Sequence, residues 1–162
     1  MRPNLNKPEG KSPGGPSNFK KEIILIATED ILKYPDRDEN NIRMIGDYVL
    51  KANAKMHTFY HTAAKADGSW ESTGEPDAFS REPKFVAQHP GDEIEALEFF
   101  EKWTGIDCVI LIGNCGRPGY KVEGTSCVPM QLVPSFTGNN DGTFFTVTFQ
   151  GDGKTSQFPV YY

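Results

Sequence analysis

Cys115 lies in a short Asn-Cys-Gly turn after an apolar run, a setting in which a thiol nucleophile can be presented. Such a nucleophile needs a base within hydrogen-bonding distance and a pair of amide donors that stabilise an oxyanion. Arg117 and Pro118 follow where a helix would have to begin, so the amides of a helix N-terminus are not expected here. We therefore interpret Cys115 as a turn residue, and the sequence predicts no catalytic residue and no enzyme activity.

His57 and His61 are four positions apart, which is the spacing of a metal-binding pair on a helix. The segment around them is predicted to be extended, and side chains four apart on a strand are too widely separated to hold one ion comfortably. We therefore expect surface or interface histidines and predict no metal site.

Gly113, Gly116 and Gly119 have the spacing of a degenerate phosphate-binding loop. A phosphate cradle needs a helix N-terminus behind the loop, and the following Tyr-Lys-Val-Glu segment is strand-like instead. The carboxylates near residue 95 belong to one amphipathic segment and have no second acidic cluster to meet. No cofactor-binding site is predicted.

The composition indicates one domain that can bury a core and has many turns. The chain has 162 residues with 37% hydrophobic residues, 16 glycines, 12 prolines and a formal net charge of −5. This acidic balance argues against a dedicated nucleic-acid binder, and no apolar run approaches the roughly 20 residues of a membrane span. Cys108, Cys115 and Cys127 are expected as free thiols, with a Cys115–Cys127 bridge as the less favoured alternative.

Residues 1–19 are predicted to form a flexible N-terminal arm, followed by a single β-rich domain over residues 20–162. The arm is rich in Pro, Gly, Asn, Ser and Lys, so it cannot bury enough apolar area to offset the entropy lost on ordering. It lacks the apolar run of a secretory signal. Leu5 and Phe19 are the apolar side chains with which it would dock on a neighbouring subunit.

One helix is predicted over residues 92–104. Its apolar stripe recurs at helical spacing and consists of Ala96, Leu97, Phe100 and Trp103. Asp92 is placed to cap the first turn, and Lys102 and Gly105 suit the C-terminal end. We expect this helix to cover one opening of a barrel or sandwich, with a partner-binding helix as the alternative.

The remaining pattern predicts strands and turns. Residues 64–81 are interpreted as a long polar connection, and Pro159 would confine a last strand to a sheet edge. Phe145, Val147 and Phe149 alternate onto one face after a hairpin signal at residues 139–142. The predicted strands are residues 22–28, two within 42–62, 82–89, 107–113, 120–122, 127–133, 143–150 and 156–162. The fold class is therefore mainly β, a β-sandwich or barrel with one packed α-helix and long hairpin loops.

Three segments carry a resemblance to a known family: residues 89–93 (His-Pro-Gly-Asp-Glu), residues 103–105 with the strand at 109–112, and residues 135–142. Over roughly residues 23–150 the chain resembles the tail tube proteins of bacteriophages, especially those of Bacteroidetes-like hosts. The resemblance implies a structural virion protein of the phage tail, made in the host bacterial cytoplasm. It also implies homohexameric rings that stack around a DNA channel.

In that family a hairpin or sheet of each subunit lines the bore, and arms and loops lock adjacent rings. The partners implied are copies of the same chain, other tail proteins, and DNA as passing cargo. Six copies at −5 would carry −30 per ring, which suits a channel that repels phosphates. We expect the contacts between copies to involve the strands within residues 44–62 and their long loop, because unpaired strand edges must be covered.

Two other functions stay open. A monomeric β-sandwich could bind a ligand on an aromatic platform of Tyr60, Trp70 and Phe79. The chain could also be another phage assembly protein, such as a neck or capsid decoration protein, which would likewise function by assembling with other subunits.

Overall fold

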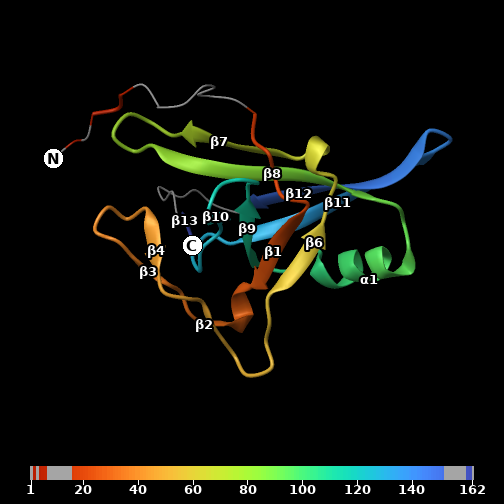
Figure 1. Ribbon diagram of the computed structural model, residues 1–162, viewed down its shortest axis with the longest axis horizontal. Coiled ribbons are helices and arrows are strands. Elements are labelled where there is room, and N and C mark those ends of the chain that lie inside the picture. Colours follow the sequence, from red (N-terminus) through yellow and green to blue (C-terminus); the bar gives the residue numbers. More distant parts are fainter. Residues whose placement is uncertain (1, 3, 7–15, 152–159, 162) are drawn as a thin grey trace.

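Strand β9 (Cys108–Gly113) is the centre of the structure, and each of its six residues is buried. The apolar run Cys-Val-Ile-Leu-Ile is typical of a strand covered on both faces. In the computed structural model, which describes residues 2, 4–6, 16–151 and 160–161, two layers of strands are arranged around β9 (Figure 1). The prediction of a mainly β fold with one packed helix is confirmed.

The strands of the first layer run in the order β6, β1, β9, β10, β13, β4, β3. All neighbours are antiparallel except β13 and β4. Their bounds are β6 (His57–Tyr60), β1 (Glu22–Ala27), β10 (Tyr120–Glu123), β13 (Val160–Tyr161), β4 (Arg43–Ile45) and β3 (Asp36–Arg37).

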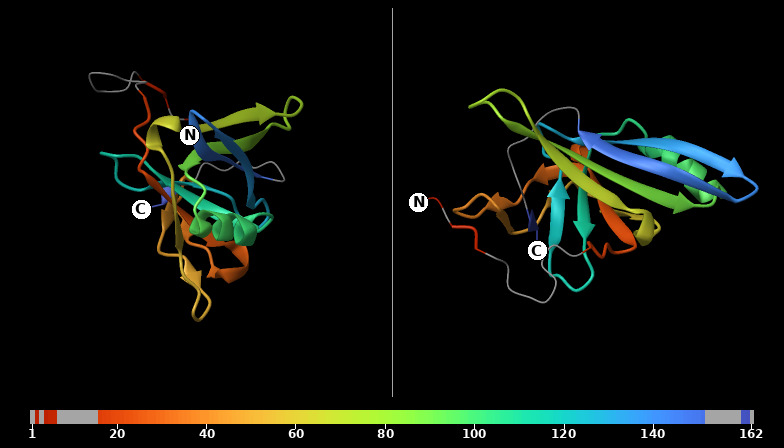
Figure 2. Two further views of the ribbon diagram at one scale, coloured as in Figure 1. Left: turned by 90° about the vertical axis from the view of Figure 1, so that its right-hand side faces the viewer. Right: turned by 90° about the horizontal axis from the view of Figure 1, so that it is seen from above.

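The second layer consists of four antiparallel strands in the order β11, β12, β8, β7. They are β11 (Met130–Asn139), β12 (Gly142–Gly151), β8 (Ser80–Pro90) and β7 (Asp67–Thr73). Met130 of β11 pairs with Cys108 of β9, so the two layers are continuous at one seam. Figure 2 shows the long strands β8, β11 and β12 side by side across the molecule.

Four minor elements of the described chain lie outside the two layers. Strands β2 (Ile31–Lys33) and β5 (Val49–Leu50) form a separate two-stranded sheet, and two short 3-10 helices cover Thr28–Asp30 and Ala63–Lys65. The predicted pair of strands within residues 42–62 is therefore three short strands, β4, β5 and β6.

Two clusters of apolar side chains form the core. The first lies between the layers and under the helix, and includes Phe59, Phe85, Phe100 and Phe149. The second lies on the other face of the first layer and is covered by the segment from Ile31 to Leu50. Alternate residues of β9 belong to different clusters: Cys108, Ile110 and Ile112 to the first, Val109 and Leu111 to the second.

Helix α1 (Ile94–Trp103) packs on the first cluster through Ala96, Phe99, Phe100 and Trp103. The prediction that Leu97 belongs to the buried stripe is wrong, since its side chain is 52% exposed and Phe99 takes that place. Asp92 is not the cap either. Glu93 occupies the N-cap position without a side-chain cap hydrogen bond, because the chain leaves β8 extended as far as Glu93.

The polar segment at residues 64–81 contains an edge strand, so its prediction as a structureless connection is wrong. β7 pairs with β8 from Asp67 opposite Val86 to Thr73 opposite Ser80. Six of the seven β7 residues are exposed. The alternation of apolar and polar residues that reveals a half-buried strand is therefore missing from its sequence.

The two ends of the described chain also differ from expectation. β13 lies between β10 and β4 and is not an edge strand, although the proline at 159 lies outside the described residues. Phe19 packs against the chain's own Phe85, with ring centroids 5.6 Å apart, and pairs with Asn114. It packs on the core of its own domain, whereas Leu5 is 99% exposed.

Candidate functional site

Cys115 lies in the turn between β9 and β10, where it helps to hold the N-terminal segment. Its backbone N–H donates to the carbonyl of Asn18 at 2.6 Å, and Lys20 N–H donates to the carbonyl of Gly113 at 2.9 Å. Because the Cys115 amide is already used, it is not placed to stabilise an oxyanion. After the turn the chain enters strand β10, so the glycine-rich segment lacks the helix N-terminus of a phosphate cradle.

His57 and His61 both point inward from one side of the chain, with Phe59 between them. His57 packs edge-on against Trp103 at 5.3 Å. His61 is fully buried between Phe59 and Phe85, at 6.5 and 5.9 Å between ring centroids. The expectation of surface histidines is therefore wrong for His61, because the chain crosses from the first layer to the second at this point.

Neither ring nitrogen of His61 has a hydrogen-bond partner among the described residues. Burial lowers the pKa of the imidazole, while the backbones of Thr62 and Lys20 act in the opposite direction. No group of three or more His, Cys, Asp or Glu side chains in the described part of the chain is arranged to hold a metal ion.

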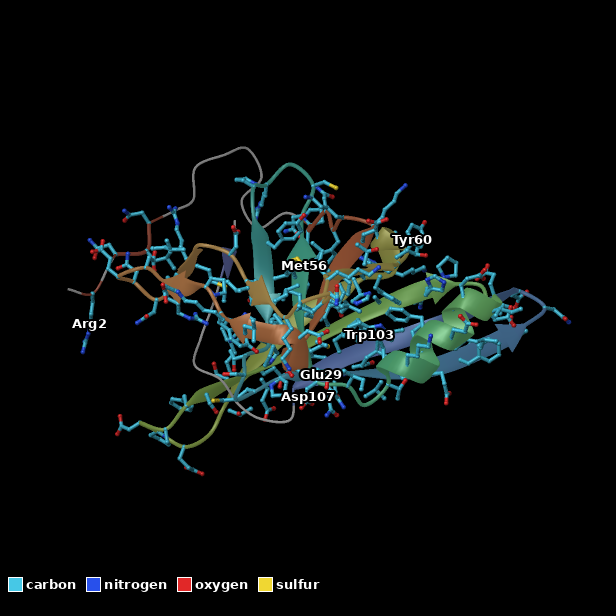
Figure 3. All side chains as sticks on the ribbon, turned by 90° about the horizontal axis from the view of Figure 1, so that it is seen from below. Arg2, Glu29, Met56, Tyr60, Trp103 and Asp107 are labelled. Carbon is cyan, nitrogen blue, oxygen red and sulfur yellow. The ribbon has the colours of Figure 1, made fainter. Side chains whose placement is uncertain are left out.

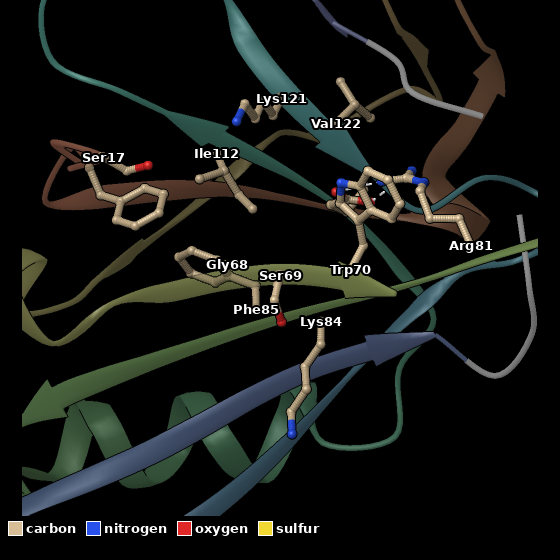
Figure 4. A pocket seen from close by; sticks show the side chains of 12 residues that line it. Ser17, Gly68, Ser69, Trp70, Arg81, Lys84, Phe85, Ile112, Lys121 and Val122 are labelled. Carbon is tan, nitrogen blue, oxygen red and sulfur yellow. Dashed lines mark hydrogen bonds and ion pairs between the residues drawn. The ribbon is translucent and has the colours of Figure 1, made fainter. Parts of the chain in front are cut away.

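A cleft of about 410 Å³ opens between the two layers, beside the first half of β8 and the last residues of β9 (Figure 4). Its walls combine aromatic and aliphatic side chains with charged ones. In Figure 4, Trp70 lies beside Arg81, and the side chain of Lys84 extends away from the cleft. The lining residues are Ser17, Phe19, Gly68, Ser69, Trp70, Arg81, Lys84, Phe85, Ile112, Lys121, Val122 and Glu123.

A buried ion pair forms one wall of this cleft. Arg81 Nη1 and Nη2 donate to Glu123 Oε1 and Oε2, both at 3.3 Å, and the Trp70 ring lies 5.7 Å from Arg81 Cζ. Burial raises the pKa of Glu123, and the Arg81 charge opposes that shift. Since each charge is matched by the other, the pair serves to connect the layers.

A second cavity, the aromatic groove, has a volume of about 320 Å³ and lies between β6, the end of β8 and α1. Figure 3 labels Tyr60 and Trp103 on this side of the molecule. His89 Nδ1 lies 2.8 Å from the carbonyl oxygen of Tyr60, so this nitrogen carries the proton and donates. The lining residues are Thr58, Phe59, Tyr60, His89, Glu93, Glu95, Ala96, Phe99 and Phe100.

The chain matches no model of a known protein family, no curated protein and no solved structure. The cavities and the exposed strand edges are therefore the features from which a function has to be inferred. No helix in the described ranges is long and apolar enough to cross a membrane.

The predicted aromatic platform is divided between two places. Trp70 lines the cleft and Tyr60 lines the aromatic groove, while Phe79 lies in the connection between β7 and β8. These three side chains therefore do not form one binding surface.

Sequence reasoning missed Arg81 and Glu123. The signal was present in β8, where Arg81 occupies an inward position in register with the buried residues Phe85 and Ala87. A charged residue in a buried register indicates a partner of opposite charge. It does not indicate which one.

Proposed function

We propose that this protein is a structural virion protein that self-assembles into stacked rings forming a phage tail tube. The observation that carries the proposal is the edge of β7, a strand that pairs on one side only, with β8, among the residues that the structure describes. An extended strand with an uncovered edge is a template for pairing with another chain, and natural proteins cover such edges in their working form.

The β7 edge is long and accessible. Within the described residues its seven positions pair on one side only, with β8, and six of them are exposed. Trp70, at the middle of the strand, is 47% exposed. Pairing between copies along this edge would extend the second layer from one subunit to the next, as expected of a ring with a continuous β wall.

The outer face of α1 is a second surface that suits an assembly. Ile94 and Leu97 are 71% and 52% exposed, and Glu98 and Glu101 lie on the same face at helical spacing. Residues 92–101 carry five carboxylates. If such a face lined the channel, its negative charge would repel phosphates and let DNA pass.

Negative-stain electron microscopy together with sedimentation analysis tests the proposal. We expect rings or tubes, and we expect the β7 amides to exchange hydrogen slowly in the particles and rapidly in dissociated subunits. A protein that stays monomeric at high concentration, or particles whose β7 amides remain unprotected, would contradict it. Recruitment only by a neck or capsid preparation would instead favour another phage assembly role.

The cleft favours a second candidate, a monomeric ligand-binding module. Its volume of about 410 Å³ lies in the range of small-molecule sites, and Trp70 offers a partly exposed ring. In a Trp103→Phe variant the fluorescence of Trp70 would report on ligands. A saturable change in a monomeric protein would favour this candidate over the tube.

A further inference from the structure

We propose that the aromatic groove binds a lysine side chain from the loop at residues 51–56 of a second copy. This inference rests on the proposed self-assembly and names one contact within it. It follows from the rings that line the groove, from the charges at its mouth, and from the complementary charge of the loop.

Aromatic rings form most of the groove wall. The Phe59 ring lies 5.5 Å from Phe99, 6.1 Å from Phe100 and 5.8 Å from His89, measured between centroids. The Tyr60 and His89 rings are 6.3 Å apart. Aromatic faces attract organic cations through their quadrupoles, and several rings around one cavity make a cation-selective site.

The charges that line the groove are negative. Glu93 and Glu95 belong to the lining, and none of the described lining residues is Lys or Arg. Gly91 has a φ of +86° and allows the Glu93 carboxylate to lie over its α-carbon, because a Cβ there would be 2.5 Å from Glu93 Oε1. Glycine at this position therefore leaves room for the carboxylate beside the groove.

The imidazole of His89 adds to the same preference. Its Nδ1–H donates to the carbonyl of Tyr60, so in the neutral ring Nε2 is a hydrogen-bond acceptor. The groove therefore favours an ammonium group over an anion, because it is lined by a hydrogen-bond acceptor, two carboxylates and four aromatic rings.

The loop at residues 51–56 has the matching properties. Lys51 and Lys55 are exposed, Met56 is 37% exposed, and the sequence from Tyr48 to Ala66 contains no Asp or Glu. In Figure 1 this loop extends downward from the fold, away from α1. A contact between two different surfaces of identical chains is head-to-tail, and such contacts generate rings when the rotation closes.

A fluorescence titration tests the groove as a cation site. The chain has two tryptophans, and Trp103 stacks on Phe99 at 5.9 Å, so a Trp70→Phe variant leaves one reporter beside the groove. We expect a saturable change on adding n-butylammonium and none with n-butanol. Glu95→Gln and Tyr60→Ala should each weaken binding several-fold. Equal responses to the alcohol and the ammonium ion, or no response, would overturn the site.

A charge-swap experiment tests the occupant. Glu93→Lys/Glu95→Lys and Lys51→Glu/Lys55→Glu should each abolish assembly, while a mixture of the two variants, or all four changes in one chain, should restore part of it, because the ion pairs form again with reversed sign but the aromatic rings still favour an ammonium group. Circular dichroism should show that each variant is folded. If each variant alone assembles as the wild type does, the groove does not bind a lysine of a second copy. The tube proposal would remain intact in that case. If wild-type protein does not assemble, the proposed function itself fails, and this occupant with it.

Discussion

Arg81 of β8 and Glu123 of β10 are joined by two parallel contacts of 3.3 Å that connect the two layers of the molecule. Their side chains are only 6% and 14% exposed. They are 42 residues apart in the sequence, on strands that are not neighbours in the sheet. Both side chains line the cleft between the layers.

Removing one member of this pair should destabilise the folded protein. We expect Glu123→Gln to lower the free energy of unfolding by about 3–5 kcal/mol, because it removes the carboxylate that faces the buried Arg81 charge. The double variant Arg81→Met/Glu123→Leu should recover most of that loss. Urea denaturation measures both. Equal losses in the single and double variants would show that the ion pair itself provides the stability.

His61 should make stability depend on pH. Burial lowers the pKa of its imidazole below the ordinary value of about 6.5, so the unfolded chain binds the proton more readily than the folded protein. The free energy of unfolding should therefore reach its full value above pH 6.5 and decrease as the pH falls below 6.5. His61→Leu should flatten the difference between unfolding free energies at pH 7.5 and pH 5.5. An unchanged slope would assign the pH dependence to other groups.

The two faces of α1 should respond differently to truncation. Trp103 is half-buried against Phe99 and His57, so Trp103→Ala should cost about 1–3 kcal/mol, less than a fully buried tryptophan. Leu97→Ala, on the exposed face, should change stability by less than about 0.5 kcal/mol. Thermal unfolding compares the two. A larger effect at Leu97 would show that the helix is covered on its outer face.

The three cysteines should fall into two classes of reactivity. Cys115 and Cys127 are exposed free thiols, whereas Cys108 is buried and its Sγ lies 3.3 Å from the carbonyl of Met130. Burial, with a smaller effect of Asp107, raises the pKa of Cys108 to about 12. A thiol-reactive dye at pH 8 should label two sites in native protein and a third only in denaturant. One labelled site after denaturation would indicate a Cys115–Cys127 disulfide.

Local pattern predicted the elements whose apolar residues follow a regular arrangement. α1, β9 and β12 follow from helical spacing, from a continuous apolar run and from strict alternation, and the hairpin before Gly142 follows from its turn residues. β7 could not be found this way, because nearly all its side chains meet solvent. The place of β13 could not be found either, since pairing with β10 and β4 is decided by long-range contacts.

The cavities could not be predicted for the same reason, because their lining residues are distant in sequence and meet only in the folded protein. The cleft joins residues from β7, β8, β9 and β10 with the segment before β1, and no sequence spacing relates them. The burial of His61 was signalled only weakly, by its register with Phe59. Charge type gave the clearest hint, because an arginine in the inward register of β8 implies a buried partner.

The central strand β9 contributes alternate side chains to both apolar clusters, so neither cluster can shift without the other. Close-packed interiors resist compression and transmit displacement. We therefore expect each subunit to move as a stiff unit under load. The bending compliance of any filament built from it would then lie in the joints between copies, where force-extension measurements on single particles would find it.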